Sequence, residues 1–147
     1  MIAVVQRVSK AAVTVEKSDY EAHIEHGLMI LLCIEQEDTS DKADWMAAKI
    51  ANLRVFEDDQ QRFNLSINDV GGSILLVSQF TLAGDCSKGN RPSFMNAAAP
   101  PDGQKRFDQV KELLKQQHEI HVECGRFGAS MQVAIVNEGP ATFILNR

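Results

Sequence analysis

The stretch that decides the fold is "GGSILLVSQFTLAGDCSKGNRPSF", residues 71–94. It begins as an apolar run of strand length, passes into the polar letters SQFTL at 78–82, and ends in a polar loop. A short apolar run between turn-forming residues is typical of a buried strand. The pattern therefore predicts a strand over 73–80 whose carboxyl end carries serine, glutamine and threonine instead of simply stopping.

Length and composition predict one globular domain over residues 1–147. The chain has 147 residues and is 44% hydrophobic, enough for a substantial core. Its formal charge of −5 and pI near 5.3 argue against a protein that holds nucleic acid through a large basic surface, although they leave room for a local RNA site. Three cysteines without a C-x-x-C spacing fit reduced thiols better than disulfides.

The same features predict a soluble, cytoplasmic protein. The longest apolar run, 27–34, is far shorter than the roughly 20 residues of a membrane-spanning helix. The opening "MIAVVQRVSK" lacks the basic segment, apolar segment and cleavage site of a signal peptide. We therefore expect no membrane partner.

Strand-like segments dominate the chain, and two helical segments interrupt them. Expected strands cover 2–8, 11–16, 28–35, 54–58, 73–80, 121–124, 131–138 and 141–146. Apolar residues recur at helical spacing over 39–54, behind Thr39 or Ser40 as a cap, and again over 100–117, behind two prolines. The predicted fold class is mixed α/β, a strand-rich single domain with two helices packed on one side of mixed or antiparallel sheets.

Histidines and cysteines offer only weak alternatives for catalysis. His118 and His121 are three residues apart, whereas a zinc-binding helix needs histidines at i and i+4, so surface and edge-strand positions are the better interpretation. His23 and His26 flank an expected turn and have no evident partner. Cys86 lies in a loop, but the sequence shows no base or helix start to activate its thiol. We expect no metal and no cofactor.

The residues alone do not decide the role of two short motifs. At 78–82 the strand end frees backbone amides that could bind an oxyanion, although many strands simply end in polar residues. Thr81 is a poor nucleophile because no histidine or lysine is tied to it by sequence. Gly139-Pro140 is typical of a turn between two strands, since proline cannot donate to a ladder and glycine permits positive φ.

Several segments together resemble one known family, the D-aminoacyl-tRNA deacylases, also described as D-tyrosyl-tRNA deacylases. They are SQFTL at 78–82, RPSF at 91–94, GRFGASMQV at 125–133, NEGPATF at 137–143 and the opening 1–16. Their order and spacing cover essentially the whole chain. One departure is Ala141, where the family usually has valine.

The resemblance implies a homodimeric, metal-free hydrolase that cleaves the ester between a D-amino acid, or achiral glycine, and the terminal ribose of tRNA. It implies that a Gly-cisPro dipeptide reaches into the other subunit's site and rejects L-aminoacyl groups. Carried over residue by residue, it assigns catalysis to Thr81 and Phe80, substrate binding to Ser78, Gln79, Phe127 and Met131, chiral selectivity to Gly139 and Pro140, and support of that loop to Arg7.

Further expectations concern the chemistry and the partners. We expect the amides of Phe80 and Thr81 to form the oxyanion site, the substrate's own 2′-hydroxyl to help activate or position water, and Thr81 to orient rather than attack. Arg91 and the lysines near it are candidate phosphate contacts, and DNA is not an expected partner. The rival interpretations are a noncatalytic dimeric RNA-binding or scaffold protein, and a metal hydrolase that uses His118 and His121.

Overall fold

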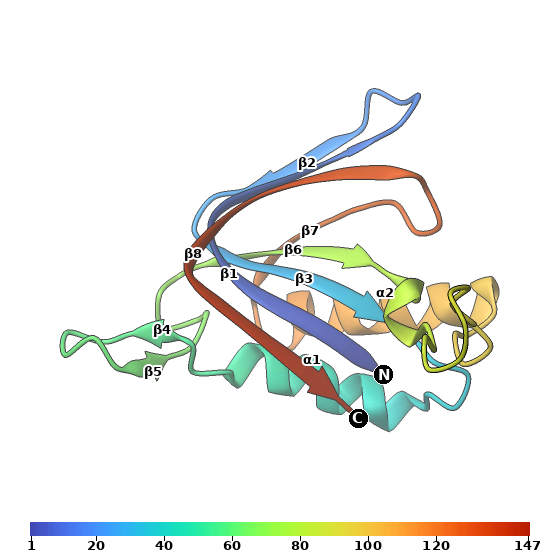
Figure 1. Ribbon diagram of the computed structural model, residues 1–147. Coiled ribbons are helices and arrows are strands. Elements are labelled where there is room, and N and C mark those ends of the chain that lie inside the picture. The colour runs from blue at the N-terminus through green and yellow to red at the C-terminus, as the bar shows by residue number, and fades with distance from the viewer.

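The computed structural model describes residues 1–147 and forms a strongly bent, strand-rich sheet with two helices on one side (Figure 1). The elements in chain order are β1 (Ile2–Val15), β2 (Glu21–Ile24), β3 (Gly27–Cys33), α1 (Ser40–Asn52), β4 (Phe56–Glu57), β5 (Phe63–Leu65), β6 (Ser73–Ser78), the short 3-10 helix η1 (Phe80–Ala83), α2 (Pro100–Gln116), β7 (His121–Cys124) and β8 (Met131–Asn146). The prediction of a mixed α/β fold with two helices is confirmed.

The main sheet is mixed, with strand order β2-β1-β3-β6-β7 and with β8 paired along β1. β1 runs antiparallel to β2, β3 and β8, whereas β6 is parallel to both β3 and β7. The long β1–β8 pair bends midway, so one half continues the sheet over the helices while the other curls back with β2 (Figure 1). Parallel pairing of β3, β6 and β7 places the carboxyl ends of β3 and β6 at the same edge.

The core lies mainly between the sheet and the two helices. α1 and α2 pack against each other and turn Met46, Ile50, Val110 and Leu114 inward, all fully buried. A smaller cluster around Met29 fills the concave side, under the curled half of β1 and β2. Both apolar stripes predicted from helical spacing therefore face the core, as expected for amphipathic helices.

Several strand boundaries predicted from the sequence are wrong. β1 continues past Ser9 as one strand, with register shifts instead of an end, and β8 continues through Gly139-Pro140, so that pair does not separate two strands. β2 and the hairpin strand β5 were not predicted because they are only four and three residues long, too short for a clear pattern. Pairing with another strand decides such segments, β2 with the long β1 and β5 with β4, and local pattern does not reveal it.

Helix ends agree closely with the prediction, but the expected cap does not form. Thr39 is the N-cap residue of α1 and its side chain makes no capping hydrogen bond. The Ser40 hydroxyl instead accepts a 2.6 Å hydrogen bond from Gln109 Nε2 of α2, so it joins the two helices. No helix of the structure has both the length and the apolar composition needed to cross a membrane.

Candidate active site

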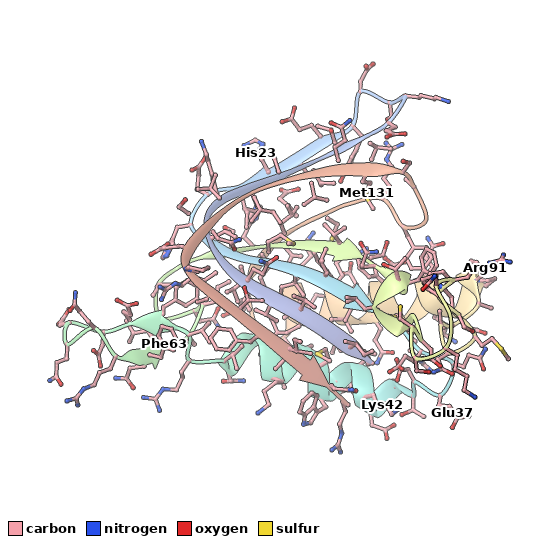
Figure 2. The ribbon with its side chains drawn as sticks, in the orientation of Figure 1. His23, Glu37, Lys42, Phe63, Arg91 and Met131 are labelled. Carbon is pink, nitrogen blue, oxygen red and sulfur yellow. The ribbon has the colours of Figure 1, made fainter.

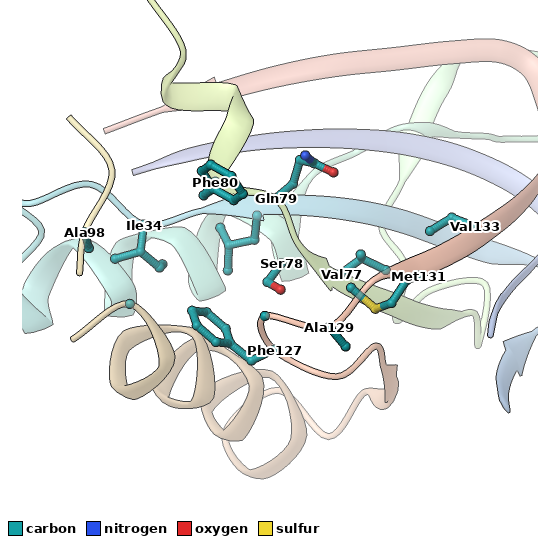
Figure 3. Close-up of a pocket in the computed structure, with 13 residues that line it drawn as sticks. Ile34, Val77, Ser78, Gln79, Phe80, Ala98, Phe127, Ala129, Met131 and Val133 are labelled. Carbon is teal, nitrogen blue, oxygen red and sulfur yellow. The ribbon is translucent and has the colours of Figure 1, made fainter. Parts of the chain in front are cut away.

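A cavity of about 260 Å³ opens at the carboxyl end of β6 (Figure 3). Its walls come from the ends of β3 and β6, the first turn of α2 and the loop that leads into β8. They are formed by Leu32, Ile34, Val77, Ser78, Gln79, Phe80, Ala98, Gly103, Phe127, Gly128, Ala129, Met131 and Val133. The structure thus brings together all four residues predicted to bind substrate, Ser78, Gln79, Phe127 and Met131, with Phe80 beside them.

The polar end of β6 is where the strand leaves its ladder. Ser78 is the last residue paired with β3, opposite Leu32, and Gln79 N still donates to Leu32 O at 2.9 Å. The chain then turns into η1, in which Leu82 N donates to Gln79 O at 3.3 Å. The amides of Phe80 and Thr81 precede that bond and have no carbonyl within the turn to bind. They lie at the end of the strand that forms one wall of the cavity.

Thr81 does not form part of the cavity wall. Its side chain is exposed, and its hydroxyl oxygen accepts a hydrogen bond from Gln79 Nε2, its only hydrogen-bond partner. No imidazole, amine or carboxylate contacts it. A hydroxyl without a base is a weak nucleophile, so this arrangement favours a positioning role over attack on the substrate.

Phe127 is held on the opposite wall by close packing. A Cβ on Gly103, in the first turn of α2, would lie 3.2 Å from Phe127 Cζ, a tight contact that would push the ring by a few tenths of an ångström. The Phe107 ring, 5.8 Å away between centroids, supports the ring from the core side. In the close-up, the Phe127 ring and the Ser78 side chain face one another across the cavity (Figure 3).

The loop that carries Phe127 is anchored to the sheet. Gly125 N donates to Leu76 O at 3.0 Å, and Tyr20 Oη donates to Cys124 O at 2.7 Å. A Cβ on Gly125 would lie 2.5 Å from Met131 Sδ, so Met131 packs directly on this glycine. The loop is therefore tied to the sheet, and Met131 covers Gly125 at the wall.

The wall of the cavity carries no ionisable side chain. It therefore supplies no general acid or base of its own. The nearest thiol is Cys33, fully buried behind the wall, which donates to Phe80 O at 3.6 Å. Burial raises the pKa of this thiol, which keeps it protonated and unreactive at neutral pH. The polar groups available to a ligand are backbone amides, the Ser78 hydroxyl and the Gln79 amide.

Gly139 and Pro140 lie in a surface bulge away from this cavity. Gln6 pairs with Thr142 and Val8 with Asn137, so the four residues 138–141 all lie opposite Arg7. The Gly139-Pro140 peptide bond is cis, and both residues are exposed. Neither belongs to the cavity wall of its own chain.

Arg7 lies beneath the bulge and is 5% exposed. Its Nε donates to Glu138 O at 3.3 Å, its Nη1 to Val55 O at 3.0 Å, and its Nη2 to Glu57 Oε1 at 3.1 Å. The guanidinium also lies 5.3 Å from the centre of the Phe63 ring. One buried side chain thus ties the bulge to the segment that leads into the β4–β5 hairpin.

The other candidate groups stay apart from the cavity. No three of the histidine, cysteine, aspartate and glutamate side chains come together as a metal site, and His121 is exposed and pairs with Glu123 at 3.2 Å. Cys86 lies exposed in the loop after η1. Cys124 is partly buried, and desolvation raises its thiol pKa to about 11.

Comparison with known proteins agrees with this geometry. A family model described as D-Tyr-tRNA(Tyr) deacylase matches residues 4–146. The chain belongs to this deacylase family. Curated deacylase relatives include "D-aminoacyl-tRNA deacylase" of Geobacter sulfurreducens, 50% identical over 99% of this chain and 95% of the relative, and that of Pelobacter propionicus, 48% identical over the whole of both chains. The predictions of a deacylase and of a hydrolytic enzyme are confirmed.

Two solved structures share the deacylase fold. One titled "c-Myc DNA Unwinding Element Binding Protein" has a TM-score of 0.91 and 40% identity, and the match covers 100% of this chain and 99% of that one. Another, described as a probable eukaryotic D-amino acid tRNA deacylase, has a TM-score of 0.85 at 16% identity over 98% of this chain and 97% of that one, which shows the fold alone.

Apart from Phe80, Phe127 and Met131, sequence reasoning did not find the apolar wall of the cavity. Leu32, Ala98 and Gly103 look like ordinary strand, loop and helix residues, because nothing in their local pattern separates a cavity wall from a core. The signal that was present is the glycine pair around Phe127 in GRFG, which the family resemblance included.

Proposed function

We propose that this chain hydrolyses the ester that joins a D-aminoacyl group to the terminal ribose of tRNA, and releases the free D-amino acid and tRNA. The observation that supports this most strongly is the cavity at the end of β6, where apolar walls meet backbone amides and no ionisable side chain is present. Such a site suits a reactive ester, which needs positioning and an oxyanion site more than a strong nucleophile.

In the proposed reaction, water attacks the ester carbonyl carbon and the negative charge develops on the carbonyl oxygen. The amides of Phe80 and Thr81 donate to that oxygen. The bond between the carbonyl carbon and the ribose oxygen then breaks, and that oxygen takes up the proton that the attacking water gives up. The neighbouring ribose hydroxyl positions this water. This last role falls to the substrate because no residue of the cavity wall can act as a base.

We further propose that selectivity comes from Gly139 and Pro140 of a partner subunit in a homodimer. Both residues are exposed and stand outside the cavity of their own chain. Exposed apolar side chains suited to a subunit interface lie on β8 and the β4–β5 hairpin, with Ile144 73% and Phe63 51% exposed. Backbone carbonyls of the bulge would collide with an L side chain and leave a D side chain or glycine free, which is selection by rejection.

The deciding experiment compares D-tyrosyl-tRNA, L-tyrosyl-tRNA and glycyl-tRNA with the purified protein. We expect hydrolysis of the D-aminoacyl and glycyl esters, with the L ester cleaved at least about 100-fold more slowly, because a steric clash of roughly 3 kcal/mol has that effect on kcat/KM. Release of the amino acid from radiolabelled substrate measures it. Equal rates with D and L esters would contradict the chiral deacylase, and no release from any ester would favour the noncatalytic RNA-binding alternative.

Two binding measurements test the partners. Light scattering should give twice the mass of one chain. Filter binding should show tRNA held more tightly than duplex DNA, since the net charge of −5 disfavours binding through phosphates alone. Duplex DNA bound as tightly as tRNA would instead support an activity of the kind named for the structural relative.

Replacing Thr81 with valine tests whether its hydroxyl attacks the ester. If Thr81 has only a positioning role, Thr81→Val should lower kcat by roughly tenfold, the size of one lost hydrogen bond in the transition state. A nucleophile would lose about 10⁴-fold or more. Single-turnover kinetics measure the rate, and denaturing gels of quenched reactions would reveal an acylated protein. Thr14→Val, at an exposed position of β1, is the matched control.

A further inference from the structure

We propose that Phe80, Phe94 and Met95, here called the apolar ledge, bind the nucleotide that precedes the terminal adenosine of the substrate RNA. The inference rests on the proposed function, which places the aminoacylated adenosine at the cavity. It adds a second subsite that accepts a stacked base from a single-stranded RNA end.

The apolar ledge is exposed and continuous with the cavity. Phe80 is 58%, Phe94 39% and Met95 80% exposed. The rings of Phe80 and Phe94 meet edge to face, with centroids 5.2 Å apart and planes at 69°. Phe80 also belongs to the cavity wall, so a ligand that leaves the cavity on this side meets the ledge at once. Met95 follows Phe94 directly in the chain, and large apolar side chains exposed at neighbouring positions often mark a binding surface.

The loop that carries the ledge is held in place before any ligand arrives. Asp85 and Ser93 exchange two backbone hydrogen bonds, at 2.8 and 3.0 Å, which close the base of the loop. Gln36 Nε2 donates to Met95 O at 2.6 Å. A Cβ on Gly84 would lie 2.9 Å from Phe94 Cε1, so the ring packs directly on this glycine. A fixed loop does not have to be ordered on binding, which favours recognition.

Charges on the same loop match an RNA backbone. Lys88 and Arg91 are both exposed and form no salt bridge, and Arg91 lies on the loop beside η1 (Figure 2). Aromatic side chains for stacking next to cations that follow the phosphates are the usual means of binding single-stranded nucleic acid. A second copy of the chain is the alternative occupant, and the association state of the ledge variant distinguishes it from RNA.

Substrates of three lengths test the ledge: D-tyrosyl-adenosine, D-tyrosyl-cytidylyl-adenosine and D-tyrosyl-tRNA. For the native protein we expect kcat/KM to rise about tenfold between the first and the second substrate, the effect of one stacked base. In the Phe94→Ser/Met95→Ala variant, most of this rise in kcat/KM should disappear. The loss should lie in KM, because stacking binds the ground state and the transition state alike.

The salt dependence of KM tests the contribution of Lys88 and Arg91 separately. The Lys88→Gln/Arg91→Gln variant should reduce the slope of log KM for D-tyrosyl-tRNA against log salt by about 1.4, which is about 0.7 for each phosphate that the variant no longer neutralises. Lys49→Gln, at an exposed position on α1, should leave that slope unchanged. Light scattering on every variant checks the association state.

Three outcomes would overturn the inference. In the first, the Phe94→Ser/Met95→Ala variant keeps the tenfold rise in kcat/KM between the first and the second substrate. In the second, the variant loses kcat/KM equally with all three substrates. In the third, the variant has half the native mass in light scattering, which would assign the ledge to a subunit interface. Failure of the proposed function gives a different result, because the native protein would then hydrolyse none of the three substrates. Met95→Ala alone, at the most exposed position of the three, separates a binding effect from misfolding of the loop.

Discussion

The Gly139→Ala variant is expected to lose about 100-fold in its preference for D- over L-aminoacyl-tRNA, while the protein stays folded. Gly139 has a φ of +119°, a region that residues with a Cβ rarely adopt. A Cβ there would lie 2.9 Å from Ala141 N and 3.4 Å from Arg7 Nη2, so the bulge has to move. Misplacing a group at a reacting centre by about 1 Å can cost about 10²-fold.

The preference is measured as the ratio of kcat/KM for the two stereoisomers of tyrosyl-tRNA. We also expect the free energy of unfolding to fall by about 1–3 kcal/mol from backbone strain. Gly71→Ala is the matched control, because Gly71 also has positive φ, +61°, but has no atom within 4 Å of its Cβ position. The control should lose a similar amount of stability and keep the full D-over-L ratio. A Gly139→Ala variant that keeps the native ratio would refute the assignment of selectivity to this bulge.

The Arg7→Met variant is expected to lose about 3 kcal/mol of stability and, in addition, part of the D-over-L preference. Methionine fills much of the space but leaves the buried Val55 carbonyl and the Glu138 carbonyl without their donors. Each unsatisfied buried carbonyl costs about 1–3 kcal/mol. Without the hydrogen bond from Arg7 to Glu138 O, the chain just before Gly139 is also less restrained, so the discrimination should fall about tenfold.

Urea denaturation measures the loss of stability. The ratio of kcat/KM for D-tyrosyl-tRNA and L-tyrosyl-tRNA measures the loss of selectivity. Arg54→Met is the control: Arg54 is exposed, and its Nε donates to Asn64 O at 2.7 Å. It should cost less than about 1 kcal/mol and leave selectivity intact. Arg7→Lys restores the positive charge without the planar fork, and we expect it to recover little. If Arg7→Met lowered stability and left the ratio unchanged, Arg7 would support only the fold.

Much of the fold could be predicted because its signals are local. The stripes of α1 and α2 and the apolar runs of β3 and β6 determine their own conformation, since helix and strand periods differ. The continuous strands β1 and β8 could not be predicted: a polar pair at Ser9 and Lys10 and the Gly139-Pro140 dipeptide both look like strand ends. Their mutual pairing over nearly the full length keeps both strands extended.

The candidate site, like the fold, was predictable only in part. SQFTL marked the end of a strand, and the family resemblance named Ser78, Gln79 and Phe127, which the structure does bring to one cavity. The residues named for selectivity, Gly139 and Pro140, do not reach that cavity within one chain. Proximity between segments tens of residues apart depends on sheet order and on bends, which no local pattern encodes.

Residue pattern alone was sufficient for the fold class, the two helices and the polar character of the end of β6, although that strand ends at Ser78 and not at Phe80 as predicted. These features depend on neighbours in the chain, through periodicity and backbone propensity. Tertiary packing decided the rest: that Phe127 faces Ser78 across a cavity without ionisable groups, that Arg7 lies beneath the Gly139-Pro140 bulge, and that Phe80 meets Phe94 on the surface. Each of these pairs joins segments that are separated in sequence, and only the paired strands and packed helices bring them together.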